Sequence, residues 1–396
     1  MKKLMILGGG PNQIPLIKAA KKNGYYVIVC DFNENAPGVN LADELCLVSI
    51  MDMEGVLEAA RKAEIDGIIS NSEPAMPIVA YVGNSLGLPS NAYETVSAMT
   101  NKFKFRKLLK DNHFAVPGFG SAETFNEAKS LFGRLNKPIM IKPEASSGSR
   151  GVAKLESEEH LKTAFEEAQR CSRNNKVILE EYIYNTCSHI VGGDIFISGG
   201  KVVFFGLMSC IRDTVNAPLV PKGEIYPAVL NSSQSDNVKN ELSRAVGSLG
   251  IKFGAINVEI MIDSRGNPCF IELNPRNGGN CIPEELLVAT GFDIFDATVR
   301  AAVGEMIDDH QTTSIVPYAT YMVSSNRPGT LKSVGFSEKV KSYIDAYLPD
   351  VKCGDMVEPF INADKRLGVL MLRFKSIEER DDILANIEDH IFVEVE

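Results

Sequence analysis

Two largely apolar runs late in the sequence each contain one glutamate, and a short polar turn joins the two runs. The runs are 257–261 and 270–273, and aspartate, glycine and asparagine occupy the turn between them. Two strand-like runs separated in this way predict a β-hairpin. Because side chains alternate along a strand, Glu259 on one run and Glu272 and Asn274 on the other can project from one face. The sequence therefore predicts a hairpin with a row of oxygen ligands on one side.

This row of oxygens has the chemistry of a magnesium site. Mg²⁺ takes one or two carboxylates together with waters and substrate phosphates, and burying Glu259 and Glu272 without a cation would be costly. Arg276, two residues beyond Asn274, would lie on the same side and offer a guanidinium fork to a phosphate or carboxylate. We therefore expect Glu259, Glu272 and Asn274 to hold metal and Arg276 to contact substrate. The alternative is a solvated hairpin with charged outer residues.

A lysine at the end of another apolar run precedes a loop of small residues. Lys142 follows the run 138–141, and residues 144–152 are rich in serine and glycine. Small residues let backbone N–H groups approach a phosphate, and lysine supplies a point charge. The pattern predicts a phosphate-binding loop, with a flexible surface loop as the alternative. A further run, 177–183, reads as an edge strand whose backbone could bind adenine, although any amphipathic strand looks similar.

The first 95 or so residues alternate strand-like and helix-like segments, which predicts a parallel α/β half-sheet. The glycines at 8–10 follow the first apolar run and supply two glycines of the dinucleotide fingerprint, but Gln13 stands where the third is needed. NAD binding is therefore disfavoured, and the turn either holds part of a substrate or is structural. The segment from about 117 to 304 has short strands and glycine-rich turns typical of an α+β region.

Composition narrows the class of function. The chain has 41 Lys plus Arg against 51 Asp plus Glu, a net charge of −10, which is opposite in sign to a nucleic-acid binder. No stretch approaches the roughly 20 apolar residues that cross a bilayer, and the N-terminal apolar run is too short for a signal peptide. We expect a cytoplasmic protein without membrane partners. The eight cysteines are scattered singly, which indicates reduced packing residues rather than a metal or redox site.

The order of these motifs resembles the ATP-grasp superfamily of carboxylate–amine and carboxylate–thiol ligases, over roughly residues 1–310. The resemblance is carried by Thr100-Asn101-Lys102, the Ile-Lys-Pro lysine, the serine–glycine loop, Glu-Glu-Tyr-Ile at 180–183 and the Glu…Glu-x-Asn-x-Arg cluster. It implies a Rossmann-like pre-ATP-grasp α/β domain at 1–98, an ATP-grasp domain at 99–310 and a small α+β closing domain at 311–396. A homodimer is the expectation for the family.

The resemblance also implies roles for individual residues. ATP would be bound through Lys102, Lys142, Ser147, Gly148, Ser149, Gly151, Glu180, Glu181 and Ile183, and two Mg²⁺ ions, or Mn²⁺ in their place, through Glu259, Glu272 and Asn274. Many members place a ribose-binding glutamate shortly after the 180–183 motif, but residues 184–189 contain none. We assign the ribose or phosphate role to His189, with a structural histidine as the alternative.

The implied reaction transfers the γ-phosphoryl group of ATP to a carboxylate, and an amine then attacks the acyl phosphate. Catalysis would depend on Lys142 and Arg276, with residues 144–152 and 214–224 as candidate lids that exclude water. Arg276 is followed by Asn-Gly-Gly, a pattern that lacks the Gln-Val-Glu-like stretch of biotin carboxylases. It resembles amino-acid ligases, in which the arginine and the backbone of the glycines, here Gly278 and Gly279, hold a carboxylate. We therefore favour an amino acid as the carboxylate. The alternatives are a bicarbonate-activating enzyme of the biotin-carboxylase or carbamoyl-phosphate-synthase type, a purine-biosynthesis ligase and an inactive ATP-binding regulator.

Overall fold

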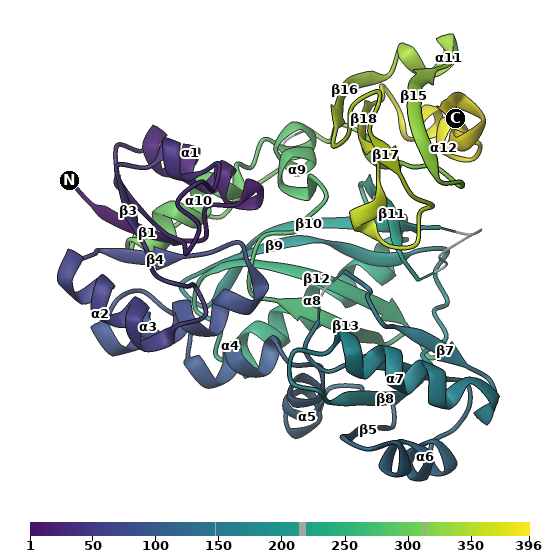
Figure 1. Cartoon of the computed structure of the whole chain (residues 1–396), viewed down its shortest axis with the longest axis horizontal. Helices are drawn as coiled ribbons and strands as arrows, with labels where there is room; N and C mark the ends of the chain where they lie inside the picture. Colours follow the sequence, from purple (N-terminus) through teal and green to yellow (C-terminus); the bar gives the residue numbers. More distant parts are fainter. Residues whose placement is uncertain (147, 214–218, 313) are drawn as a thin grey trace.

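The computed structural model describes residues 1–146, 148–213, 219–312 and 314–396 (Figure 1). Ser147 and residues 214–218 of the second candidate lid lie outside the described residues, so their predicted roles have no structural counterpart here. Within the described ranges, no helix combines the length and the apolar character needed to cross a bilayer.

The N-terminal region is a four-stranded parallel sheet in the order β3-β2-β1-β4. Its strands are β1 (Lys3–Leu7), β2 (Tyr26–Cys30), β3 (Glu44–Cys46) and β4 (Gly67–Ile69), and its helices are α1 (Ile14–Lys22), α2 (Met53–Ala63) and α3 (Met76–Leu86). Leu4 and Ile6 pack on one face and Met5 and Leu7 on the other. Both faces are covered, which explains why these strands read as continuous apolar runs. The predicted α/β half-sheet is confirmed.

Two short helices, α4 (Tyr93–Met99) and α5 (Lys102–Asp111), lead into a second, smaller antiparallel sheet in the order β5-β8-β6-β7. Its strands are β5 (Phe119–Ala122), β6 (Ile139–Pro143), β7 (Ala153–Leu155) and β8 (Val177–Glu181), with helices α6 (Phe125–Arg134) and α7 (Leu161–Cys171). Asn101 caps α5 by accepting a hydrogen bond from the backbone of Lys104, so α5 begins at Lys102. The cap fixes Lys102 at the first position of the helix, where its backbone amide donates to the carbonyl of Glu144, just past β6.

The largest element is an eight-stranded antiparallel sheet in the order β13-β12-β9-β10-β11-β14-β18-β16. Its members are β9 (Ile190–Ser198), β10 (Lys201–Arg212), β11 (Pro221–Tyr226), β12 (Gly254–Ile262), β13 (Pro268–Asn274), β14 (Tyr318–Val323), β16 (Ile344–Pro349) and β18 (Gly368–Arg373). The last three come from the C-terminal part of the chain and continue the sheet. The domain boundaries at 98 and 310 therefore stay predictions, because α4 crosses the first and one sheet spans the second.

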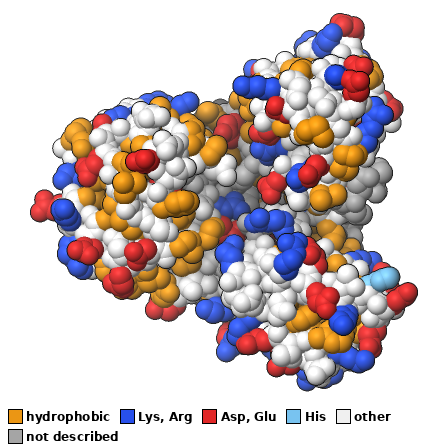
Figure 2. Space-filling view, viewed as in Figure 1, with side chains coloured by type: hydrophobic (Ala, Val, Ile, Leu, Met, Phe, Trp, Pro, Cys, Tyr) orange, Lys and Arg blue, Asp and Glu red, His pale blue; other side chains and the backbone are white. Residues whose placement is uncertain are grey.

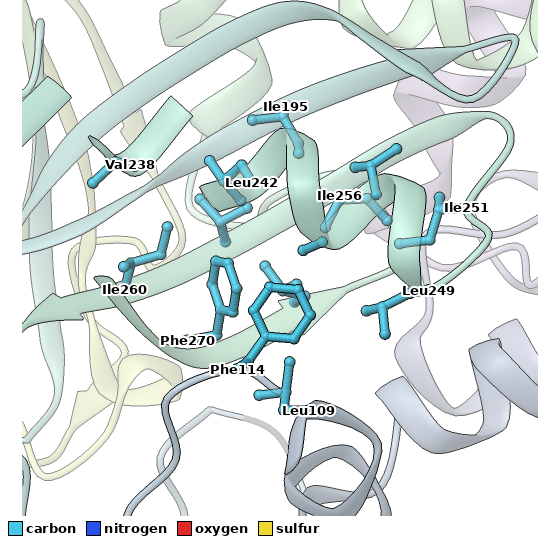
Figure 3. Close-up of a cluster of buried hydrophobic side chains, with 14 of the residues drawn as sticks. Leu109, Phe114, Ile195, Val238, Leu242, Leu249, Ile251, Ile256, Ile260 and Phe270 are labelled. Carbon is cyan, nitrogen blue, oxygen red and sulfur yellow. The ribbon is translucent and has the colours of Figure 1, made fainter. Parts of the chain in front are cut away.

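One face of the large sheet packs on a hydrophobic core, and the other carries polar side chains. Helix α8 (Ser232–Ser248) places Val238 and Leu242 against Ile195 and Ile260 of the core face (Figure 3). Helices α9 (Ile282–Thr290) and α10 (Ile294–Ala302) lie on the opposite side. Leu286 of α9 belongs to that second core. Away from α9, Arg212, Glu259 and Glu272 on this face are partly exposed.

The C-terminal part adds a three-stranded sheet, β17-β15-β19, beside the large one. It is built from β15 (Gly329–Phe336), β17 (Met356–Val357) and β19 (Ile391–Val395), with helices α11 (Glu338–Lys341) and α12 (Ile377–Leu384). In Figure 1 this part forms one lobe, the β5–β8 sheet with α6 and α7 a second and the N-terminal sheet a third, all arranged around the large sheet.

Candidate active site

The predicted site residues converge between the small sheet and the polar face of the large sheet. Figure 2 shows the surface hollowed between the three lobes, with lysine and arginine side chains gathered in the hollow. The residues come from the start of α5, from β6 and β8 of the small sheet and from β12 and β13 of the large one. Segments far apart in the sequence thus meet at one place.

A buried carboxylate with two cationic partners lies on the small-sheet side. Glu180 of β8 accepts from Lys142 of β6 at 2.6 Å and from Arg106 of α5 at 2.5 Å. Arg106 also donates to the backbone carbonyl of Phe270 at 2.8 Å, which ties the small sheet to the large one. Burial would raise the pKa of Glu180, but Arg106 and Lys142 outweigh it and lower the pKa to about 2. The structure thus brings Lys142 and Glu180 together in one ion cluster.

The Glu181 side chain points away from the Lys142–Glu180–Arg106 cluster. The Glu181 carboxylate accepts from the backbone amide of Asn136 at 2.9 Å and from that of Gly118 at 3.3 Å, on the opposite side of the strand. Ile183 lies just past the end of β8 and is half-buried. The roles of Glu180, Glu181 and Ile183 around an adenine stay predictions, with the Glu180 side chain committed to Lys142 and Arg106.

The hairpin that carries Glu259 and Glu272 forms as predicted, with one irregularity. Strands β12 and β13 pair so that Glu259 lies opposite Glu272 and Asn257 opposite Asn274. The register shifts beside Glu259, which leaves Ile271 as an extra residue in β13. Such a bulge re-aims side chains, so Phe270 reaches the core while Glu272 stays on the site face.

Two opposed carboxylates repel each other, and nearby cations offset this. Lys102 of α5 contacts Glu272 at 2.5 Å, and Arg212 of β10 contacts Glu259 at 3.2 Å. Burial favours the protonated form of Glu272, but Lys102 and the amide of Asn274 lower its pKa to about 2. Glu272 is therefore an anion in the folded protein.

This donor set fits Mg²⁺. Among the described residues there is no group of three or more His, Cys, Asp or Glu side chains that could hold a metal, and the predicted set has only two carboxylates plus the amide oxygen of Asn274. Mg²⁺ is bound in this manner, with waters and substrate phosphates completing its shell. A divalent ion would supply the positive charge that Lys102 and Arg212 now provide to Glu272 and Glu259. The assignment of Glu259, Glu272 and Asn274 as ligands stays a prediction.

Arg276 lies where the N-terminal region meets the hairpin. Its guanidinium donates to the carbonyl of Asn277 at 2.8 Å and lies 3.6 Å from the carboxylate of Glu73, which follows β4. Burial, and then the charge of Glu272, raise the pKa of Glu73, whereas Lys102 and Arg276 lower it. Neither Glu73 nor Arg106 was predicted from the sequence as a site residue.

The glycines after Arg276 differ from the prediction. The Gly278 amide donates to Asp194 of β9 at 2.8 Å, so it is not free for a substrate carboxylate. A Cβ at Gly278 would meet Asp194 at 2.8 Å, which explains why the position is glycine. Gly279, by contrast, has open space around it. Of the predicted pair, Gly279 keeps a backbone that can approach a ligand.

The serine–glycine loop has the backbone geometry of a tight turn. Gly148, Ser149 and Gly151 have φ angles of 71°, 55° and 68°. The Ser149 hydroxyl donates to the carbonyl of Leu219 at 3.3 Å, so the first candidate lid touches the described end of the second. Phosphate binding by Gly148, Ser149 and Gly151 stays a prediction.

His189 lies apart from the residues described above. Its ring nitrogen pairs with the hydroxyl of Ser188 at 2.9 Å, and the ring faces Asp381 and Arg380 of α12. Burial lowers its pKa, which favours the neutral ring. Within the described part of the chain it makes no hydrogen bond to the Lys142–Glu180–Arg106 cluster, and its ribose or phosphate role stays a prediction.

The N-terminal glycine turn is closed by its own side chains. The Gly9 amide donates to Asp31 at 2.7 Å, and the Gln13 side chain accepts from the backbone of Asn71 at 2.8 Å. A carboxylate therefore occupies the amide that a phosphate would use. These contacts favour the structural interpretation of the turn.

The sequence of this chain matches two known protein families and several characterised proteins. The family described as "Carbamoyl-phosphate synthase L chain, ATP binding domain" matches residues 101–310, and "PylC-like, N-terminal domain" matches residues 4–85. The formate-dependent phosphoribosylglycinamide formyltransferase of Sulfurisphaera tokodaii is 24% identical over 392 residues, which cover 96% of this chain and 94% of that protein.

Solved structures share the fold along the whole chain. The L-amino acid ligase from Bacillus licheniformis has a TM-score of 0.83 at 20% identity and covers 100% of this chain and 99% of its own. The phosphoribosylglycinamide synthetase from Anaerococcus prevotii has a TM-score of 0.75 at 22% identity and covers 100% of both chains. The match over residues 101–310 spans more than half of the chain, so the protein belongs to the carbamoyl-phosphate synthase L chain ATP-binding family of ATP-grasp ligases, enzymes that use ATP and Mg²⁺ to form C–N bonds.

Proposed function

We propose that this ligase phosphorylates the carboxylate of an amino acid and joins the resulting acyl group to an amine. The observation that carries the proposal is the position of Arg276. It lies beside the Glu259–Glu272 hairpin and is followed by Gly279, which has an open backbone. An arginine in this position can hold a carboxylate by a planar fork next to the phosphates.

The surrounding residues supply what phosphoryl transfer requires. Negative charge spreads over the transferred group, so catalysis consists of positioning and charge neutralisation. Lys142 and Lys102 are the cations proposed to contact the ATP phosphates, and Lys102 would exchange its contact with Glu272 for one with phosphate. When bound at Glu259, Glu272 and Asn274, Mg²⁺ would neutralise phosphate charge. No side-chain nucleophile is needed, because the amine attacks the acyl phosphate directly.

Two observations favour an amino acid over the other carboxylates. The Gly9 amide is occupied by Asp31, which argues against a phosphoribosyl group at the N-terminal glycine turn. Residues 277–280 contain no acid after Arg276, in contrast to the stretch typical of biotin carboxylases. A bicarbonate-activating or purine-type ligase is therefore less well supported. An inactive regulator is disfavoured because Lys102, Lys142, Glu259 and Glu272 are all present.

A pooled screen tests the proposal. The full-length enzyme is incubated with Mg-ATP and pools of amino acids and amines, and ADP release and product mass are measured. We expect ADP release only in pools with an amino acid, and loss of that release in Lys142→Ala. ADP release that requires bicarbonate or formate and ignores amino acids would contradict the proposal. The predicted homodimer and the division into three domains at 98 and 310 belong to the same proposal and are tested by light scattering and limited proteolysis.

A further inference from the structure

A second group of buried acids lies on the polar face of the large sheet, beyond the Glu259–Glu272 hairpin. The floor there has no side chain at Gly192 of β9, whereas Leu286 of α9 packs over the neighbouring Gly206 of β10. The Glu224 side chain from β11 reaches over this floor, and one carboxyl oxygen lies 3.2 Å from the position that a Cβ of Gly192 would take. The glycine at 192 therefore makes room for the Glu224 carboxyl group.

Carboxyl oxygens of two glutamates on this face, Glu224 and Glu285, lack hydrogen-bond partners among the described residues. Oε2 of Glu224 and both carboxyl oxygens of Glu285 are buried without a hydrogen-bond partner among the described residues, although Thr320 faces Glu285. Glu224 is 5% exposed and Glu285 is fully buried. More than nine in ten buried polar groups in proteins are paired, and an unpaired one costs free energy. Two such acids on one face point to a donor that arrives with a ligand.

The charges around Glu224 decide which kind of donor that is. Asp194, Glu259 and Glu285 add negative charge around Glu224. Two cations oppose these acids: Arg212, which contacts Glu259 and has an unpaired Nε, and Arg380, which acts on Glu285. The site is thus short of positive charge. Burial raises the pKa of Glu224 to about 8 and that of Asp194 to about 6, which is the response of acids that lack a cation. An ammonium group would supply both the missing charge and the missing hydrogen bonds.

The position of Glu224 relative to Arg276 links the two ends of one substrate. Asp194 is close enough to both to connect them: its carboxylate accepts from the amide of Gly278, two residues after Arg276, and its charge acts on Arg276 and on Glu224. We propose that Glu224, supported by Glu285, binds the ammonium group of the amino acid whose carboxylate is held at Arg276. This inference rests on the proposed function and deepens it, because it makes the amino group a requirement for the substrate.

The test compares an amino acid with its 2-hydroxy analogue. The amino acid that releases most ADP in the pooled screen is assayed against the 2-hydroxy acid with the same side chain, in wild type and in Glu224→Gln. We expect wild type to prefer the amino acid by at least about a hundredfold in kcat/KM, because an analogue without the donor leaves buried acids unpaired. Glu224→Gln should raise the amino-acid KM at least about tenfold and narrow that preference. The KM for ATP should stay within about twofold.

Two variants serve as controls. Glu241→Gln changes a glutamate on α8 that pairs with the neighbouring Arg244, and it should alter neither KM. Glu285→Gln should raise the amino-acid KM and narrow the preference over the 2-hydroxy acid, as Glu224→Gln does, but by a smaller factor. Both site variants should melt at or above the wild-type temperature, because each removes an unpaired buried acid, so a loss of activity cannot be ascribed to unfolding.

The outcomes separate the two proposals. If wild type uses amino acids but Glu224→Gln leaves the amino-acid KM and the preference over the hydroxy acid unchanged, the ammonium site is wrong and the proposed function stands. If wild type accepts the hydroxy acid as well as the amino acid, the ammonium site is also wrong. If ADP release depends on bicarbonate or formate alone, both proposals fail together.

Discussion

Glu180 and Glu224 are both buried glutamates of the site, but their surroundings are opposite. Glu180 lies between Lys142 and Arg106, and its pKa falls to about 2. Glu224 has one oxygen without a partner, and burial raises its pKa to about 8. The same side chain is thus a permanent anion in one place and an acid that keeps its proton in the other.

The difference indicates how the site divides its work. The small-sheet side, around Glu180, is complete without ligand and holds Lys142 in position. The side around Glu224 is incomplete and becomes satisfied only when a cation binds. Under the proposed function, the side around Glu180 is the preformed nucleotide half, and the side around Glu224 is the half that responds to the second substrate. Each prediction below perturbs one half and compares it with the other.

The largest expected effect is on stability, from Glu180→Gln. The change leaves Lys142 and Arg106 without their counter-charge, and breaking a buried ion pair costs about 3 to 5 kcal/mol of unfolding free energy. The matched control is Glu181→Gln, in which an adjacent and more exposed carboxylate loses hydrogen bonds to backbone amides. We expect it to cost about 1 kcal/mol or less. Equal denaturation midpoints for the two variants would show that the Glu180 cluster is not the complete half.

A smaller effect is expected on catalysis from Lys142→Ala. The loss of a preorganised charge next to the transferred phosphoryl group should cost at least about 2 kcal/mol of transition-state stabilisation, or roughly thirtyfold in kcat/KM. Steady-state kinetics with Mg-ATP measure this loss of kcat/KM. The control is Lys104→Ala, which removes an exposed lysine of α5. A rate within about threefold of wild type would mean that Lys142 only pairs with Glu180.

The smallest effect concerns the pH dependence of stability. The folded-state pKa of Glu224 lies above its ordinary value, so its contribution to stability is full at low pH and is lost as pH rises toward about 8. Glu180 behaves in the opposite sense, because its folded-state pKa is lowered to about 2. Its contribution to stability is full above its ordinary pKa and is lost as pH falls toward about 2. Relative to Glu224→Gln, wild type should therefore lose unfolding free energy as pH rises from 5 to 9.

Melting curves at the two pH values measure this difference without any substrate. The comparison isolates the titration of Glu224, because the charged and titratable groups around it are present in both proteins. These groups are Asp194, Cys210, Arg212, Glu259 and Glu285. A constant difference between the two proteins across the range would mean that Glu224 has an ordinary pKa and is paired.

The sequence predicted those parts of the site that depend on local pattern. The hairpin that carries Glu259 and Glu272 follows from alternation along two strands, and the structure confirms the pairing. The bulge at Ile271 does not follow, because an extra residue in one strand has no signature in a single sequence. The motifs around Lys102 and Lys142 identified both lysines as candidate site residues. They did not indicate which carboxylates pair with them, namely Glu272 and Glu180.

Residues whose importance comes from tertiary contacts were missed. Arg106 pairs with Glu180 across 74 residues of sequence, and its only local signal is an arginine on the apolar side of α5 between Phe105 and Leu109. Glu224 and Glu285 are ordinary glutamates in sequence and become significant only once their burial is known. The amide of Gly278 donates to Asp194, 84 residues away in sequence, a contact that the Arg-x-Gly-Gly pattern does not show.

The central claim is that a carboxylate is activated by phosphorylation, and transfer of ¹⁸O tests it most directly. The substrate found in the screen is labelled with ¹⁸O in its carboxylate and turned over with Mg-ATP and the acceptor amine. If an acyl phosphate forms, one carboxylate oxygen bridges carbon and phosphorus and leaves with phosphate when the amine attacks the carbon. We predict one ¹⁸O atom in each inorganic phosphate released, measured by mass spectrometry. Unlabelled phosphate, or label found in AMP, would contradict the account.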